Sequence, residues 1–263
     1  MVKCKDTLEN FHMDLQDAIQ KIEERGDFNR FIEVKPIFEQ RLGELKPNDH
    51  AERGLCYYYL LVAYLKGKLV HETEECMHFY RKMGKAFSLQ EREYLKGSQK
   101  YAWSEVVDFY RLMERCYGSL EFLYLQHDFS ERHLEAYRRK MTYRKDAAFF
   151  KRHYLRFFEY KFLEVTAFYG TSIWRWSLTT LAFSVIIAFA HMLADLTLPV
   201  ELRTVQNPSA WFDYFYLSII TITTVGFGDI TPVSTIGKIL TMTEAFLGFV
   251  MLSIFVSLIT KKP

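Results

Sequence analysis

A ten-residue run near the C-terminus, Thr223–Pro232 (TTVGFGDITP), has residue types suited to presenting bare main chain. Gly226 and Gly228 stand on either side of Phe227, and glycine adopts positive φ angles at little cost, so this spacing permits a backbone of alternating handedness. A strongly apolar stretch leads into the run, which a glycine-rich surface turn would not need. Non-helical main chain at membrane depth is tolerated only where protein buries it or a water-filled path runs beside it. We therefore expect a re-entrant loop whose available ligands are main-chain oxygens.

The elements that must position this run are the apolar segments around it. Trp176–Ala194 carries no formal charge apart from His191, and its nineteen residues, at about 1.5 Å each, are enough to cross a hydrocarbon core. Ile239–Thr260 is a second span, interrupted only by Glu244. Between them, Trp211–Ile222 is too short to span but long enough for a half-depth helix.

Basic residues indicate the orientation of the two spans. They gather before the first span and after the second (Lys151, Arg152, Arg156, Lys161, Arg175, Lys261 and Lys262). Only Arg203 and Lys238 lie near the loop between the spans. The positive-inside rule then places both termini in the cytoplasm of a multi-pass cell-membrane protein. Trp174 and Trp176 open the first span, where indole rings favour the membrane interface.

Over residues 174–260 the sequence resembles the potassium channel family whose subunits have two transmembrane helices and one pore loop. The family's filter motif, TVGYG or TVGFG, stands here at Thr224–Gly228, followed by Asp229 and, within the second span, by Gly248. The resemblance implies a homotetramer around a common axis, with K⁺ as the transported ion and no organic cofactor. It implies a pore domain over residues 166–263, with an outer helix at about 174–196, a pore helix at about 211–222, a filter at 223–229 and an inner helix at about 236–260.

The resemblance also implies a role for each filter residue. K⁺ enters a narrow pore only if oxygens replace its hydration shell, and four filter segments would stack main-chain oxygens in rings. The implied ligands are the carbonyl groups of Thr224, Val225, Gly226 and Phe227, with the Thr224 hydroxyl, and Gly228 completes the filter. The side chains of Val225 and Phe227 are expected to point away from the axis and pack behind the filter.

Phe227 departs from many members of the family, which have tyrosine at this position. Phenylalanine has no hydroxyl to donate to the pore helix, so each subunit loses one tether of its filter. Members with GFG remain K⁺ selective. We therefore expect a selective filter that is more prone to inactivation than a tyrosine version.

Polar residues around the filter are expected to support it, with Thr223 at its base. Asp229 at the outer mouth concentrates cations, forms a local cap, or does both, while Ile220 stands where some relatives carry a carboxylate partner for this aspartate. Glu244 requires a partner or a function, because a carboxylate inside a span is expensive. We favour a hydrogen bond over a pore-lining ion site. The expected donors to Glu244 are threonines (Thr223, Thr224 or Thr241).

Two further residues in the spans have more than one interpretation. Gly248 is a candidate gating hinge, as in many members of the family, or a site of close helix packing, for which small residues are favoured. His191 is expected to be interfacial or hydrogen-bonded rather than a proton sensor. Neither span carries the regularly spaced arginines of a voltage sensor, so we expect gating by another stimulus.

Residues 1–165 are densely charged and have no alternating strand pattern, which predicts a cytoplasmic helical domain in an all-α protein. Tyr57–Lys68 faintly resembles one helix of a tetratricopeptide repeat, and such arrays bind partners. The alternative is a plain helical bundle that shapes the assembly. We expect helices over residues 6–25, 27–45, 49–65, 73–87, 89–117 and 130–169.

No enzyme motif and no zinc motif is evident in this domain, so we expect no catalysis. Its four cysteines are far apart and suit a reducing cytosol (Cys4, Cys56, Cys76 and Cys116). The spacing of His71, Cys76 and His78 fits no standard zinc pattern. The chain ends soon after the second span, so we expect regulation to reside in the N-terminal residues unless the chain is part of a longer protein.

The segment Arg138–Lys161 holds nine basic residues against two acidic ones. Leu155, Phe158, Phe162 and Val165 recur at helical spacing, so one face is apolar. Such a helix beside the membrane is suited to anionic lipid, although a basic face of the helical domain exposed to water is an equal alternative.

The sequence thus predicts a K⁺-selective channel that conducts passively and whose gating is coupled to the N-terminal domain, which a protein or small molecule regulates. A weakly selective cation channel is one alternative. A membrane-anchored interaction protein with a non-conducting pore is another.

Overall fold

The computed structural model describes residues 13–24, 28–67, 74–97, 101–197, 199, 203–205 and 211–260, which form ten helices and no strand. This confirms the predicted all-α fold. The chain divides into two compact units, Met1–Phe158 and Glu159–Pro263, whereas the sequence placed the division at residue 165. Several residues used in the sequence predictions lie outside the described residues (Cys4, Asp6, Asp27, His71, Thr73, Lys261 and Lys262).

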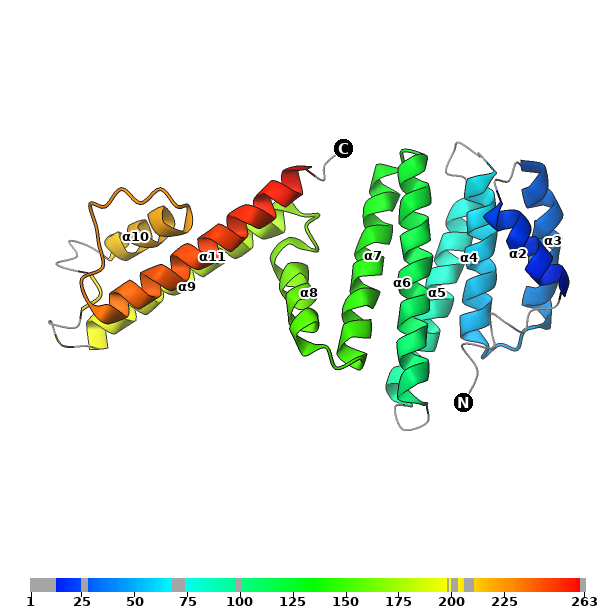
Figure 1. Cartoon of the computed structure of the whole chain (residues 1–263), viewed down its shortest axis with the longest axis horizontal. Coiled ribbons are helices and arrows are strands. Elements are labelled where there is room, and N and C mark those ends of the chain that lie inside the picture. The colour runs from blue at the N-terminus through cyan, green and yellow to red at the C-terminus, as the bar shows by residue number, and fades with distance from the viewer. Residues whose placement is uncertain are drawn as a thin grey trace. The chain divides into compact units, whose positions relative to one another are not determined.

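The N-terminal unit is an array of helices (Figure 1). Neighbouring helices pack in pairs, and α4 also contacts α2 and α6. Aromatic rings fill much of the core: Tyr110 stacks on Phe150 and Tyr117 on Tyr143. The helices are α2 (Met13–Glu23), α3 (Phe28–Glu44), α4 (His50–Lys66), α5 (Glu74–Lys96), α6 (Trp103–Gln126) and α7 (Ser130–Phe150).

Helix α5 does not end near Phe87 as the sequence predicted, but continues to Lys96. A single glycine inside a helix costs only about 1 kcal/mol relative to alanine, so Gly84 is tolerated. The buried face continues past the predicted end, with Gln90 and Tyr94 following Phe87 at helical spacing. Burial of this face therefore outweighs the local signal to stop.

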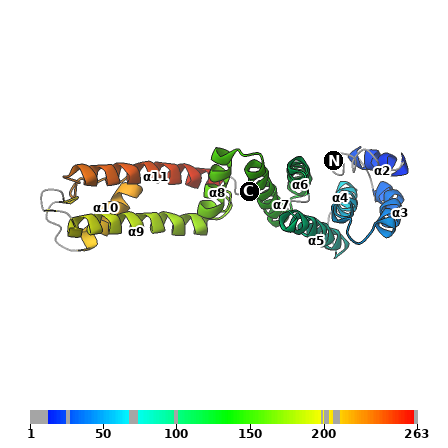
Figure 2. The same ribbon diagram turned by 90° about the horizontal axis from the view of Figure 1, so that it is seen from below.

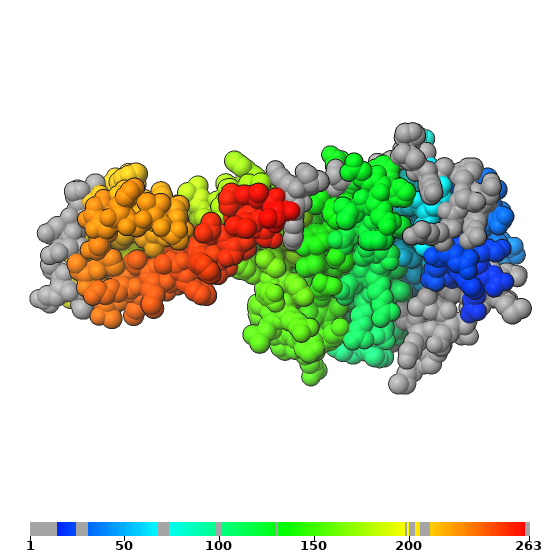
Figure 3. Space-filling model, turned by 45° about the horizontal axis from the view of Figure 1, so that its top comes forward, coloured from blue at the N-terminus to red at the C-terminus, as the bar shows by residue number. Residues whose placement is uncertain are grey.

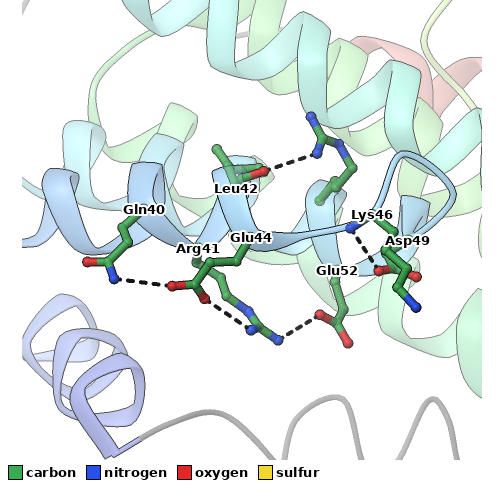
Figure 4. Close-up of polar contacts among 8 residues, drawn as sticks. Gln40, Arg41, Leu42, Glu44, Lys46, Asp49 and Glu52 are labelled. Carbon is green, nitrogen blue, oxygen red and sulfur yellow. Dashed lines mark hydrogen bonds and ion pairs between the residues drawn. The ribbon is translucent and has the colours of Figure 1, made fainter.

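Polar contacts fasten the turn between α3 and α4 (Figure 4). Arg41 on α3 donates to Glu52 on α4 at 3.1 Å. Asp49, at the N-cap position of α4, makes no capping bond to the helix, and its carboxylate instead accepts the Lys46 amide at 3.1 Å. The turn is thus closed by side chains from both of its ends.

Residues 130–169, predicted as one helix, form two: α7 ends at Phe150 and α8 covers Tyr154–Ala167. Arg152 adopts φ 60°, the His153 amide donates to Ala148 O at 3.0 Å, and the Arg152 amide donates to Phe149 O at 2.9 Å. These bonds make a Schellman motif, which usually places glycine at the left-handed position. An arginine there gave no sequence signal for the break.

The second unit contains α9 (Ile173–Thr197), α10 (Phe212–Ile222) and α11 (Thr235–Thr260). Helices α9 and α11 are long and apolar enough to cross a membrane, whereas α10 is short. The two long helices lie side by side and α10 packs against both (Figure 2). The pair thus supports a short helix and the segment that follows it.

Candidate functional site

Helix α10 delivers the chain to the glycine-containing segment. It is eleven residues long, and its buried side chains face α9 and α11 (Tyr214, Leu217, Ser218, Ile220 and Ile222). The helix ends at Ile222, and the hydroxyl of the C-cap residue Thr223 donates to Ile219 O at 2.6 Å. The run that follows is non-helical, as expected for a re-entrant loop.

The backbone of this segment adopts positive φ at every second residue. The angles are 60° at Thr224, 56° at Gly226 and 79° at Gly228. The two glycines match the handedness expected from their spacing. A positive φ is an outlier for a β-branched residue, so Thr224 is held in a strained conformation that sequence reasoning did not anticipate.

Amide groups at the start of the segment turn back to the end of α10. Thr224 N donates to Thr221 O, and the amides of Val225 and Gly226 both donate to Ile220 O, all at 2.9–3.0 Å. Among the described residues, no backbone amide donates to the carbonyl oxygens of residues 224–228. The first three amides of the segment are therefore engaged with the end of α10, while its carbonyl oxygens accept no bond from a backbone amide of the described residues.

All residues from Thr223 to Asp229 are exposed in the single chain. Val225 is 54% and Phe227 is 71% exposed, so this chain alone does not supply the packing expected behind the segment. Figure 3 shows the orange part of the chain, which contains this segment, at the surface of its unit. Within the single chain, apolar neighbours leave more than half of the Val225 and Phe227 side chains uncovered.

Asp229 is tied to α10 by a residue that the sequence analysis did not single out. Tyr216 donates its hydroxyl hydrogen to Asp229 Oδ2 at 2.6 Å. This bond lowers the pKa of the Asp229 carboxyl below its ordinary value. The missing carboxylate partner at Ile220 is thus replaced by a phenol one turn earlier.

Glu244 is fully buried and lies behind α10 rather than facing open space. Its Oε2 accepts a hydrogen bond from Ser218 at 3.2 Å, so the donor is none of the three threonines expected. The Thr223 hydroxyl is engaged with its own helix. Among the described residues, neither Glu244 Oε1 nor the Thr241 hydroxyl has a hydrogen-bond partner.

A family model described as an ion channel matches residues 175–262, which contain most of α9 and all of α10, the glycine-containing segment and α11. Residues 175–262 form an ion-channel domain. The match confirms the family resemblance noted for the sequence over nearly the same residues, and with two membrane-length helices it assigns the protein to a membrane. No curated protein and no solved structure matched the chain.

Gly248 of the channel domain lies against the end of α10. A Cβ atom at this position would come within 2.4 Å of Ile222 O and within 3.0 Å of Ile222 C and Cα. Helix α11 continues through Gly248 without a break. The contact supports the close-packing interpretation of this glycine.

Asp195, which the sequence analysis passed over, organises the loop that follows α9. It is 6% exposed, and its carboxylate accepts the Thr204 amide, the Val205 amide at 3.2 Å and the Tyr214 hydroxyl at 3.1 Å. From the sequence alone, an acidic residue at the end of a span does not indicate which distant donors its carboxylate accepts. Nearby, His191 is fully buried and neither ring nitrogen has a hydrogen-bond partner among the described residues, so the hydrogen bond expected as one alternative is not found there.

Proposed function

We propose that the channel domain conducts K⁺ passively through a filter built from the main-chain oxygens of four chains. The observation that carries the proposal is the alternation of positive φ at Thr224, Gly226 and Gly228. With the sign of φ alternating, successive carbonyl groups point toward one side. The K⁺ ligands are then the carbonyl oxygens of residues 224–227, with the Thr224 hydroxyl.

Four copies are required because one chain contributes only one filter segment. The exposure of Val225 and Phe227 supports this requirement, since neighbouring subunits would provide the apolar packing that the single chain lacks. Native mass spectrometry of the detergent-solubilised protein tests it. A tetramer is expected, and a monomer in a native-like bilayer would refute the proposed pore.

The charges around the filter support cation conduction. Asp229 is exposed at the end of the proposed filter, and its carboxylate is negative at neutral pH, which concentrates cations at the mouth. The C-terminal end of α10, which carries the negative pole of the helix dipole, leads directly into the filter. Glu244 is fully buried behind α10, so we assign it a supporting role rather than a place in the ion path.

Ion flux decides between this function and its alternatives. Purified protein in liposomes should pass K⁺, and its reversal potential under opposing K⁺ and Na⁺ gradients should follow K⁺. A reversal potential near zero would instead indicate a weakly selective cation channel, and no flux would indicate a membrane-anchored interaction protein. Gly226→Ala should abolish flux because an L-residue is strained at φ 56°, whereas Gly43→Ala, at a glycine with open space around it, should not.

We further propose that the N-terminal unit couples a regulator to the channel. A groove of about 1490 Å³ runs along α2, α4 and α6, with Tyr58, Tyr59, Arg115 and His127 among its lining residues. In helical arrays such grooves bind partners. Recording from cells tests this: Arg115→Glu should change open probability, while Arg111→Glu, on the same helix but outside the groove lining, should not.

With both termini in the cytoplasm, α8 would lie just inside the membrane, and we propose anionic lipid as its partner. The sequence suggested the whole segment 138–161, but Lys140 pairs with Glu121 and Arg144 with Glu114, both on α6. These pairs engage basic residues of the first half of the segment in packing. The proposal therefore narrows to residues 151–161.

The exposed face of α8 supports this narrower proposal. Leu155 is 89% and Phe158 65% exposed, and the cations Arg156 and Lys161 are exposed on the same helix. Each basic residue near an anionic surface contributes about 1 kcal/mol. Arg156→Gln should weaken the response of channel activity to anionic lipid in liposomes, whereas Arg81→Gln, an exposed arginine on α5, should leave it unchanged. Equal responses in both variants would exclude lipid contact at α8.

A further inference from the structure

We propose that Asp195 is a positioning residue for the outer end of the filter, an inference that rests on the proposed channel function. Asp195 lies in the last turn of α9 and does not contact the filter itself. It acts through two short segments, residues 204–205 and residues 232–233, which lie between its carboxylate and the chain that leaves the filter.

The first link is the buried carboxylate itself. Oδ1 accepts the Thr204 amide, and Oδ2 accepts both the Val205 amide at 3.2 Å and the Tyr214 hydroxyl at 3.1 Å. Three donors from two parts of the chain thus converge on one side chain. Hydrogen bonds to an ionised carboxylate are shorter and stronger than neutral ones, so this group fixes residues 204 and 205 against both α9 and α10.

The second link runs from these residues to the exit of the filter. Val205 forms an isolated antiparallel bridge with Pro232, and the Val233 amide donates to Thr204 O at 3.1 Å. Pro232 has no amide hydrogen, and the bridge uses the amide of the following residue, Val233. Asp229, the last filter residue, is only three residues before Pro232. A shift at Thr204 is therefore passed to the chain directly beyond the filter.

The third link ties the same residue to the inner helix. A Cβ atom on Gly237, in the first turn of α11, would come within 2.6 Å of Thr204 O. Thr204 is fully buried, and its hydroxyl also donates to His191 O at 3.4 Å. Thr204 is therefore held between the Asp195 carboxylate on one side and the first turn of α11 on the other. Loss of the bond to Asp195 removes one of these two constraints.

The substitution Asp195→Asn tests the proposal. Asparagine has nearly the same shape but replaces one acceptor oxygen with an NH₂ group, which faces a donor. We expect K⁺ current to decay several-fold faster when external K⁺ is lowered, with the initial K⁺ over Na⁺ selectivity unchanged. Tyr214→Phe, which removes one of the three donors and keeps the charge, should give a smaller change in the same direction. Thr197→Val is the control, since its hydroxyl bonds only to carbonyls of its own helix.

A second measurement does not depend on conduction. Hydrogen exchange of the detergent-solubilised protein should be roughly tenfold faster at the Thr204, Val205 and Val233 amides in Asp195→Asn than in Thr197→Val. Faster exchange at residues 204–205 without any change at Val233 would overturn the proposal. So would a lower melting temperature with an unchanged rate of current decay, because Asp195 would then serve stability alone. A wild-type protein without K⁺ flux would refute the proposed function, while the exchange at Val233 would still decide whether Asp195 holds this segment.

Discussion

Gly248 of α11 lies directly against the main chain of Ile222, the last residue of α10, with no space between them for a Cβ atom. This contact joins α11 to the start of the proposed filter, since the amides of Val225 and Gly226 donate to the carbonyl of Ile220, two residues before Ile222. Movement of α11 at this point would therefore displace the first residues of the proposed filter.

Gly248→Ala is expected to distort the proposed filter rather than only stiffen α11. The added methyl group would approach Ile222 O to 2.4 Å, and a backbone atom cannot move aside as a flexible side chain can. Overpacking of this kind costs about 1–3 kcal/mol. We expect a lower melting temperature and loss or altered selectivity of K⁺ current in liposomes.

The hinge interpretation of Gly248 predicts a different result. If Gly248 served mainly as a bending point, alanine would lower the open probability and leave selectivity and melting temperature unchanged. Gly43→Ala, in the last turn of α3 with open space around the glycine, is the control and should leave the melting temperature and the K⁺ selectivity unchanged.

Phe227→Tyr is expected to slow inactivation of the proposed filter. The tyrosine hydroxyl restores a hydrogen-bond donor that Phe227 lacks. The 71% exposure of Phe227 leaves room for the added oxygen in the single chain. Macroscopic currents during long depolarisations provide the measurement. Unchanged inactivation kinetics would count against the missing tether as its cause.

Tyr216→Phe is expected to make the outer mouth more sensitive to acid. The hydrogen bond from Tyr216 stabilises the charged form of Asp229 and so lowers its pKa below the ordinary 3.8. This stabilisation is fully present above pH 3.8 and is lost as the pH falls through the lowered pKa. Without the bond, the carboxylate takes up a proton at higher pH. Single-channel conductance should therefore begin to fall at a higher external pH than in the wild type. Asp229→Asn should remove the acid response, and a response that persists there would assign it to another group.

Ser218→Ala is expected to destabilise the channel domain by about 1–3 kcal/mol, because it leaves a second oxygen of the buried Glu244 without a partner. Thermal unfolding in detergent measures the effect. Ser253→Ala is the control, since its exposed hydroxyl bonds only to Phe249 O of its own helix. Similar melting temperatures for the two variants would show that the Ser218–Glu244 bond contributes little.

The features that could be predicted from sequence depend on neighbouring residues. The positive φ angles at positions 226 and 228 follow from the glycines there, and the two spans follow from the length and apolarity of their segments. The features that were missed depend on residues far apart in the chain. Nothing in the sequence around Asp195 indicates that its carboxylate binds the Val205 amide and the Tyr214 hydroxyl, and Ser218 lies 26 residues from Glu244.

Prediction from local patterns also failed at two positions where a residue adopts a backbone conformation that its type usually avoids. Arg152 occupies the left-handed position that ends α7, where glycine is the usual signal. Thr224 adopts a positive φ although β-branched residues avoid it. In both places the surrounding hydrogen bonds hold a conformation that the residue type alone disfavours.

Trp176, in the first turns of α9, donates its indole hydrogen to Met251 O at 2.8 Å and stacks on Phe255 with the ring centroids 4.6 Å apart. The part of α11 that follows Gly248 is thereby clamped to the beginning of α9. If α11 bends, its C-terminal end and the beginning of α9 must therefore move together. The point about which they would rotate is the corner before α9, where Phe168, Tyr169 and Gly170 all adopt positive φ.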